Sequence, residues 1–174
     1  MAKNRTFRST QAPSVEDRHV MIRVVLLSSI LLGIVLTLSH ILLAGMVDDA
    51  RRWLNGLRTG VGLIIFWLFV TASVRSLHRL RPDIAFIYAV LTGVATAFFG
   101  ILSFLLILRI VALIWDSGSA NLPSYSILGF YSAAGLIAAL FSMIHYRIKN
   151  KTLGTILEFV LVIGSALAVV YLLG

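Results

Sequence analysis

Long apolar stretches separated by short basic segments constrain this chain more than any other feature. Five such stretches occupy residues 24–47, 59–77, 84–115, 125–146 and 152–173. A bilayer core about 30 Å thick needs about 20 apolar residues per crossing helix, because a helix rises about 1.5 Å per residue. The pattern therefore predicts an all-α, polytopic integral membrane protein, a bundle of five transmembrane helices.

The composition agrees with a membrane environment. Hydrophobic residues make up 59% of the chain and charged residues only 13%, with a mean hydropathy of +0.98. A soluble domain of this composition would expose far too much apolar surface. The chain has no cysteine, which excludes disulfide bonds, thiolate nucleophiles, cysteine-ligated zinc and iron–sulfur clusters.

The chain divides into a polar N-terminal segment and a membrane-embedded domain. Residues 1–13 are polar, basic and without periodicity, and we expect a disordered cytoplasmic tail. Residues 14–174 form a single membrane-embedded domain in this interpretation. Ser14 and Asp17 have the S-x-x-D spacing of a helix start, so a helix beginning there should continue into the first span.

A short amphipathic helix is predicted between the first two spans, at residues 48–58. Trp53, Leu54 and Leu57 share one helical face there, whereas the charged residues occupy the opposite face. Such a helix fits the headgroup layer. The second span is then short, and Arg58 and Arg75 must extend outward from its two ends for it to cross the membrane.

The distribution of basic residues predicts the orientation. With five crossings, the N-terminal segment and the turns at 75–83 and 145–151 share one side. That side carries Lys3, Arg5, Arg8, Arg18, Arg23, Arg75, Arg79, Arg81, Arg147, Lys149 and Lys151. The other side carries Arg51, Arg52 and Arg58. Because cytoplasmic loops are enriched in Lys and Arg, we expect a cytoplasmic N-terminus and an external C-terminus in a bacterial inner or plasma membrane.

The basic turns also indicate the partners of the cytoplasmic face. We expect their side chains to contact anionic lipid headgroups. These residues are Arg75, Arg79, Arg81, Arg147, Lys149 and Lys151. Nucleic acid is the competing partner for a chain of net charge +8. The basic residues form short turns beside spans instead of one basic patch, so no nucleic-acid binding is expected.

Charged residues inside spans are costly and are therefore candidates for function. Glu158 lies about two turns into the fifth span. It is either a carboxylate that carries protons or couples to an ion, or a structural group paired with the adjacent basic turn. His40, Arg109 and Asp116 all fall in the outer half of the membrane. They form a candidate site for an anion or a quinone headgroup, or else connect helices by hydrogen bonds.

The histidines do not predict a metal or a cofactor. His19, His78 and His145 lie at the cytoplasmic boundary, whereas His40 lies in the outer half, so no two face each other as a transmembrane haem requires. No local spacing of the H-x-x-x-H kind is present. We expect neither a metal site nor a cofactor.

Small residues four apart recur in the later spans, at Gly129/Ala133, Gly135/Ala139 and Gly164/Ala168. Such pairs let helix backbones approach closely in a membrane, within the chain or with partners.

The chain shows no acid, base and nucleophile at one depth, so we do not expect an enzyme. The leading interpretation is a non-catalytic accessory or structural subunit of a larger membrane complex, with membrane-protein partners or as a homo-oligomer. The alternative is a small transporter or channel that uses Glu158 or the pair His40 and Arg109.

Overall fold

The structure is a computed structural model. It describes residues 15–44, 52–82, 84–114, 123, 125 and 127–147, together with residues 152, 156, 159, 160, 163 and 164. Four helices fill these ranges: α1 (Val15–Ala44), α2 (Arg52–Leu80), α3 (Phe86–Ile114) and α4 (Ile127–Arg147). The protein is thus all-helical in its described part, as predicted. The expected tail at residues 1–13 lies outside it.

Three of the helices are long and apolar enough to cross a membrane. They are Val15–Leu43, Gly56–Leu80 and Phe86–Ile114, and Ile127–Met143 is a shorter apolar helix. The fifth predicted span, 152–173, falls mostly outside the described residues, although each of its described residues is helical. The chain therefore has at least three helices suited to spanning a membrane.

The second span differs from the prediction in one respect. α2 runs without interruption from Arg52 to Leu80, so residues 52–58 are its first two turns and no separate interfacial helix. Residues 48–51 lie outside the described part. Arg58 does not end the helix because arginine is a good helix former, and Gly56 and Gly60 cost only about 1 kcal/mol each. The second span, Gly56–Leu80, consequently has 25 residues, against 29 in each of its two neighbours, and is long enough to cross.

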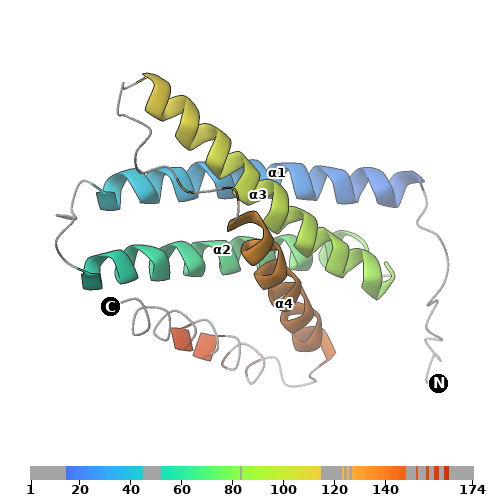
Figure 1. The fold of residues 1–174 in the computed structure, drawn as a ribbon. Helices are drawn as coiled ribbons and strands as arrows, with labels where there is room; N and C mark the ends of the chain where they lie inside the picture. The colour runs from blue at the N-terminus through green and yellow to red at the C-terminus, as the bar shows by residue number, and fades with distance from the viewer. Residues whose placement is uncertain are drawn as a thin grey trace, which may run out of the picture.

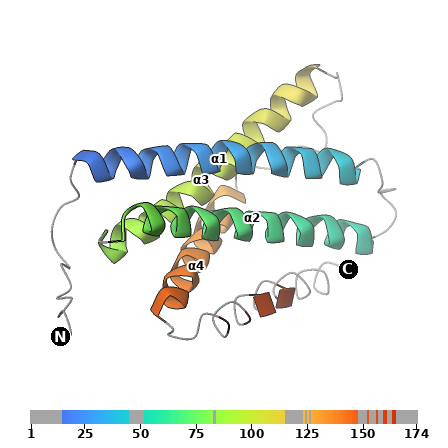
Figure 2. The same ribbon diagram turned by 180° about the vertical axis from the view of Figure 1, so that it is seen from behind.

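The four helices form two layers. α1 and α2 lie side by side and antiparallel, and α3 crosses both obliquely on one side (Figure 1). α4 lies in the same layer as α3 and packs against α3 and α2. Figure 2 shows the opposite face, where α1 and α2 lie in front. Buried side chains of all four helices meet between the layers, among them Leu32, Phe66, Ile101 and Ala138.

Glycine sets the spacing of the helices at these crossings. A Cβ atom added to Gly33 would lie 2.6 Å from the Cβ of Ser103, and one added to Gly93 would lie 2.5 Å from that of Ala139. Both distances are far below van der Waals contact. The close approach of α1 to α3, and of α3 to α4, therefore requires glycine at these positions.

Ion pairs connect three segments at one end of the bundle. Arg81, in the connection between α2 and α3, binds Glu16 and lies 3.3 Å from Asp17, both in the first turn of α1. The start of α1, the end of α2 and the start of α3 therefore share one end (Figure 2).

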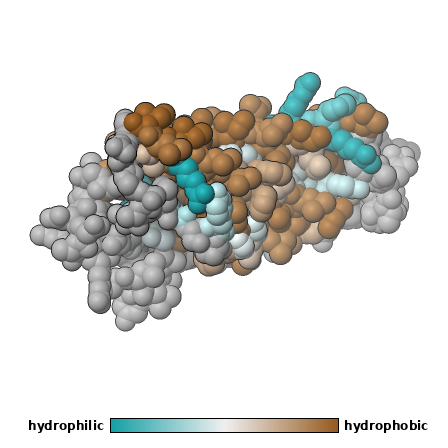
Figure 3. Space-filling model, turned by 45° about the horizontal axis from the view of Figure 1, so that its top comes forward, coloured by the Kyte–Doolittle hydropathy of each residue, from teal (hydrophilic) through white to brown (hydrophobic). Residues whose placement is uncertain are grey.

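The outer surface of the helix bundle is largely apolar. In Figure 3 brown, hydrophobic side chains cover most of the visible face, and the teal, hydrophilic ones lie mainly toward its ends. Large hydrophobic residues such as Leu27, Leu42 and Phe130 are more than 60% exposed. A surface of this kind is compatible with lipid as the solvent.

Candidate functional site

A cavity of about 510 Å³ opens between all four helices. It lies near the C-terminal end of α1 and the N-terminal end of α2, opposite the end held by Arg81. Its volume falls in the range of small-molecule sites, about 300–1,000 Å³. The lining residues are Leu36, Ser39, His40, Arg58, Thr59, Gly62, Leu63, Ile101, Phe104, Pro123, Ile127, Phe130 and Tyr131.

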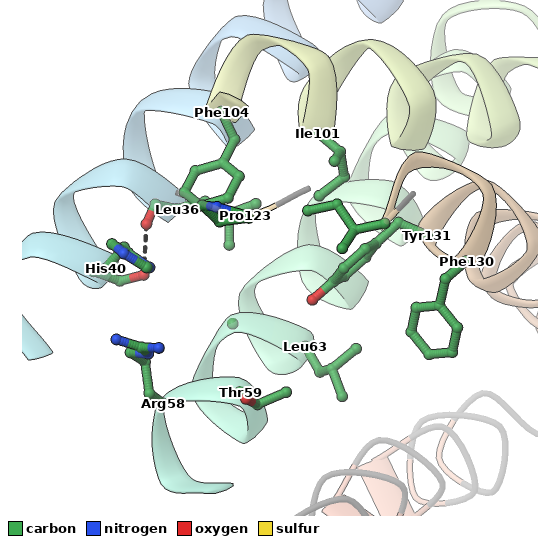
Figure 4. A pocket seen from close by; sticks show the side chains of 13 residues that line it. Leu36, His40, Arg58, Thr59, Leu63, Ile101, Phe104, Pro123, Phe130 and Tyr131 are labelled. Carbon is green, nitrogen blue, oxygen red and sulfur yellow. Dashed lines mark hydrogen bonds between the residues drawn. The ribbon is translucent and has the colours of Figure 1, made fainter. Parts of the chain in front are cut away.

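Two basic side chains lie at one end of this cavity. His40 comes from α1 and Arg58 from α2, and Figure 4 shows them next to each other. Both are half-buried. The ring of His40 packs edge-on against Phe104, with centroids 5.8 Å apart, which fixes the imidazole on that side of the cavity.

Hydroxyl groups complete the polar part of the lining. Ser39 donates a hydrogen bond of 3.0 Å to the Leu36 carbonyl, shown as the dashed line in Figure 4. The Tyr131 hydroxyl points toward the half of the cavity that holds Arg58 and His40. Its ring is held edge-on by Phe66, with centroids 4.9 Å apart. Thr59 is the third hydroxyl-bearing residue of the lining, and the other lining residues are mainly aliphatic or aromatic, so the cavity is largely apolar with one basic end.

Arg109, which was predicted to share a site with His40, does not line this cavity. Its guanidinium donates a hydrogen bond to the Tyr125 hydroxyl and lies 4.0 Å from the centroid of the Tyr125 ring. A cation over an aromatic face is stabilised by the ring quadrupole. In this arrangement Arg109 joins the end of α3 to the residues before α4.

The other predicted site residues divide into two groups. Arg75 and Arg79 lie in the last two turns of α2, and Arg81, just after its end, forms the ion pairs described above. The remaining predicted residues have side chains outside the described part of the chain. These are Asp116, Arg147, Lys149, Lys151 and Glu158. Among the residues that the structure describes, no three His, Cys, Asp or Glu side chains come together as a metal site.

Sequence reasoning included His40 in a candidate site but did not pair it with Arg58. The overlooked signal was that His40 and Arg58 lie at similar depths along their helices. His40 lies four residues before the end of α1, and Arg58 lies six residues after the start of α2. Two antiparallel helices joined by a short connection bring such positions to similar depth. Tyr131 gave no sequence signal, because its place beside them depends on how α4 packs.

Several hydroxyl groups of the described helices bond to the backbone of their own helix, whereas those of Thr96 and Ser142 are buried without a hydrogen-bond partner. Thr37 donates to the Gly33 carbonyl at 2.8 Å, and Thr92 donates to the Tyr88 carbonyl at 2.8 Å. Ser29 is different, because it donates across helices to the Thr96 carbonyl at 3.4 Å. The hydroxyl groups of Thr37, Thr92 and Ser29 are therefore satisfied as parts of the helices and of their packing.

Comparison with protein-family models, with curated proteins and with solved structures finds no match to this chain.

Proposed function

We propose that this protein is a non-catalytic subunit of a larger membrane complex, with an accessory or structural role. The observation that carries the proposal is a pair of small residues on the outer face of α4. Gly129 and Ala133 are both exposed, and a Cβ added to Gly129 would meet nothing within 4 Å among the described residues. A small-xxx-small pair of this kind suits the close approach of another helix.

The second small pair of α4 supports this interpretation by contrast. Gly135 and Ala139 face α3, where an added Cβ on Gly135 would collide with the Cβ of Ala97. One small pair thus serves internal packing. By analogy, the other is proposed to receive a helix from a partner subunit.

The topology completes the proposal. The chain crosses the membrane five times, with a cytoplasmic N-terminus and an external C-terminus, in a bacterial inner or plasma membrane. The start of α1, the end of α2 and the start of α3 meet at Arg81, which supports this topology. The basic residues near these helix ends then lie on one side of the membrane, as the positive-inside rule requires; they are Arg18, Arg23, Arg75 and Arg79. Anionic lipid headgroups are the proposed partners of that side.

A packing variant tests the subunit proposal. Gly129→Leu places a bulky side chain on the outer face of α4, and Leu31→Phe enlarges an exposed residue on α1 as the matched control. The protein is purified from its native membrane in mild detergent, and the stoichiometry of co-purified membrane proteins is measured by quantitative mass spectrometry. We expect a stoichiometric partner with the parent chain and the control, and at least a tenfold loss with Gly129→Leu.

The other results contradict the proposal in distinct ways. A homogeneous oligomer of this chain alone would favour the transporter or channel instead. Glu158→Gln, which keeps the shape of the side chain and removes its charge, is a second test. If Glu158 is structural, this variant should accumulate and bind its partner normally. Normal accumulation together with a null phenotype would instead show that the carboxylate itself carries the activity.

A further inference from the structure

We propose that the cavity binds a membrane lipid whose headgroup is a compact anion. The anion lies between Arg58 and His40, and the hydrocarbon chain occupies the apolar part of the lining. This site is distinct from the outer face of α4 on which the subunit proposal depends, so either proposal can fail alone.

The charges of the lining favour an anion. Arg58 and His40 supply the basic groups, and none of the lining residues is acidic. Among the described residues no ion pair or hydrogen bond connects Arg58 to another side chain. A cation inside a membrane span is costly without a counter-charge. A bound anion would supply that charge, and the planar fork of an arginine matches phosphate or carboxylate oxygens.

The remainder of the lining favours a hydrocarbon chain. Leu63, Ile101 and Phe130 lie away from the basic end (Figure 4), and Ile127 also lines the cavity. The Tyr131 hydroxyl points toward the basic half and gives a neutral donor beside the anion (Figure 4). A lipid has this same division into a charged end and an apolar body, whereas free phosphate would leave most of the cavity wall without a partner.

Gly62 provides a way to fill the cavity without disturbing the fold. It lines the cavity, and a Cβ added there would meet nothing within 4 Å. A leucine at this position would therefore extend into the cavity instead of into the packed helices. Gly164→Leu is the matched control, because a Cβ at Gly164 would also meet nothing within 4 Å and Gly164 lies outside the cavity lining.

The experiment measures lipid binding to the full chain in nanodiscs or detergent by native mass spectrometry. The probes are phosphatidic acid, phosphatidylcholine of the same acyl chains, and inorganic phosphate. We expect preferential binding of phosphatidic acid. Loss of one charge-assisted contact in Arg58→Gln should weaken it about 10-fold to 100-fold.

Gly62→Leu should reduce phosphatidic acid binding as strongly as Arg58→Gln, while Gly164→Leu should leave it unchanged. Equal binding of the two lipids would overturn the anion site. Binding of inorganic phosphate that Gly62→Leu leaves intact would show a phosphate site and overturn the lipid site. An unchanged affinity in Arg58→Gln would also overturn the proposed site, because the anion would then not depend on Arg58. Thermal unfolding of every variant separates loss of binding from loss of fold.

Discussion

At the scale of single residues, glycines with different surroundings share the same small-xxx-small pattern. Gly135 lies against Ala97 of α3, whereas Gly129 lies in open space two turns earlier on the same helix. The consequence of adding one methyl group therefore depends on packing and not on residue type. Open glycines such as Gly129 and Gly62 are positions where a side chain can be introduced as a probe.

Gly135→Ala and Gly129→Ala should change stability in opposite directions. The methyl group at residue 135 overpacks the contact with Ala97, so we expect a loss of about 1–3 kcal/mol in the free energy of unfolding. At residue 129 only the helix propensity changes, which should stabilise the protein by up to about 1 kcal/mol. Reversible unfolding in detergent micelles measures both. Equal effects of the two substitutions would mean that α4 does not pack on α3 as described.

At the scale of elements, Arg81 connects two otherwise separate pieces of chain. It follows the end of α2 and reaches the first turn of α1, where Glu16 and Asp17 also interact favourably with the N-terminal end of the helix dipole. The ion pair lies at the end of the bundle, and the Glu16 side chain is 77% exposed. Its contribution to stability should be limited by solvent screening for that reason.

Arg81→Gln should lower the free energy of unfolding by less than about 1 kcal/mol, as expected for exposed ion pairs. Unfolding at low and high salt provides the measurement, and the small difference between parent and variant should shrink further as salt increases. A loss well above 2 kcal/mol would instead show that Arg81 is essential to the docking of α1 on the connection between α2 and α3.

At the scale of the whole molecule, the alternating directions of the helices decide which charges share a side. α1 and α2 are antiparallel, and α3 starts at the end where α2 finishes (Figure 1). The uninterrupted α2 matters here, because a 25-residue apolar helix at Gly56–Leu80 is long enough to cross the membrane. A second span that only entered and left the membrane would invert every later helix.

Reporter fusions test this topology. A fusion after Leu80 and one after Lys151 should both report the cytoplasm, whereas fusions after Ile114 and after Gly174 should report the external side. The positive-inside asymmetry of the basic turns is the physical reason. Matching signals after Lys151 and Gly174 would exclude the fifth crossing, and matching signals after Leu80 and Ile114 would exclude the third.

The sequence alone determined the helical class, the suitability of the helices for a membrane and the C-terminal ends of three of the helices. The predicted spans 24–47, 84–115 and 125–146 correspond to α1, α3 and α4, which end within a few residues of them at Ala44, Ile114 and Arg147. These properties follow from local quantities, the length and hydropathy of a run of residues. The interfacial helix was less predictable, because the same amphipathic pattern also fits the first turns of a longer helix.

Only the tertiary structure decided which distant residues meet. His40 was expected near Arg109, yet it shares its cavity with Arg58 and Tyr131, while Arg109 binds Tyr125. The sequence indicates how deep each residue lies along its helix, but it does not indicate how each helix is rotated about its axis or where two helices cross. Those depend on close contacts such as Gly33 on Ser103 and Gly93 on Ala139, which involve residues far apart in the chain.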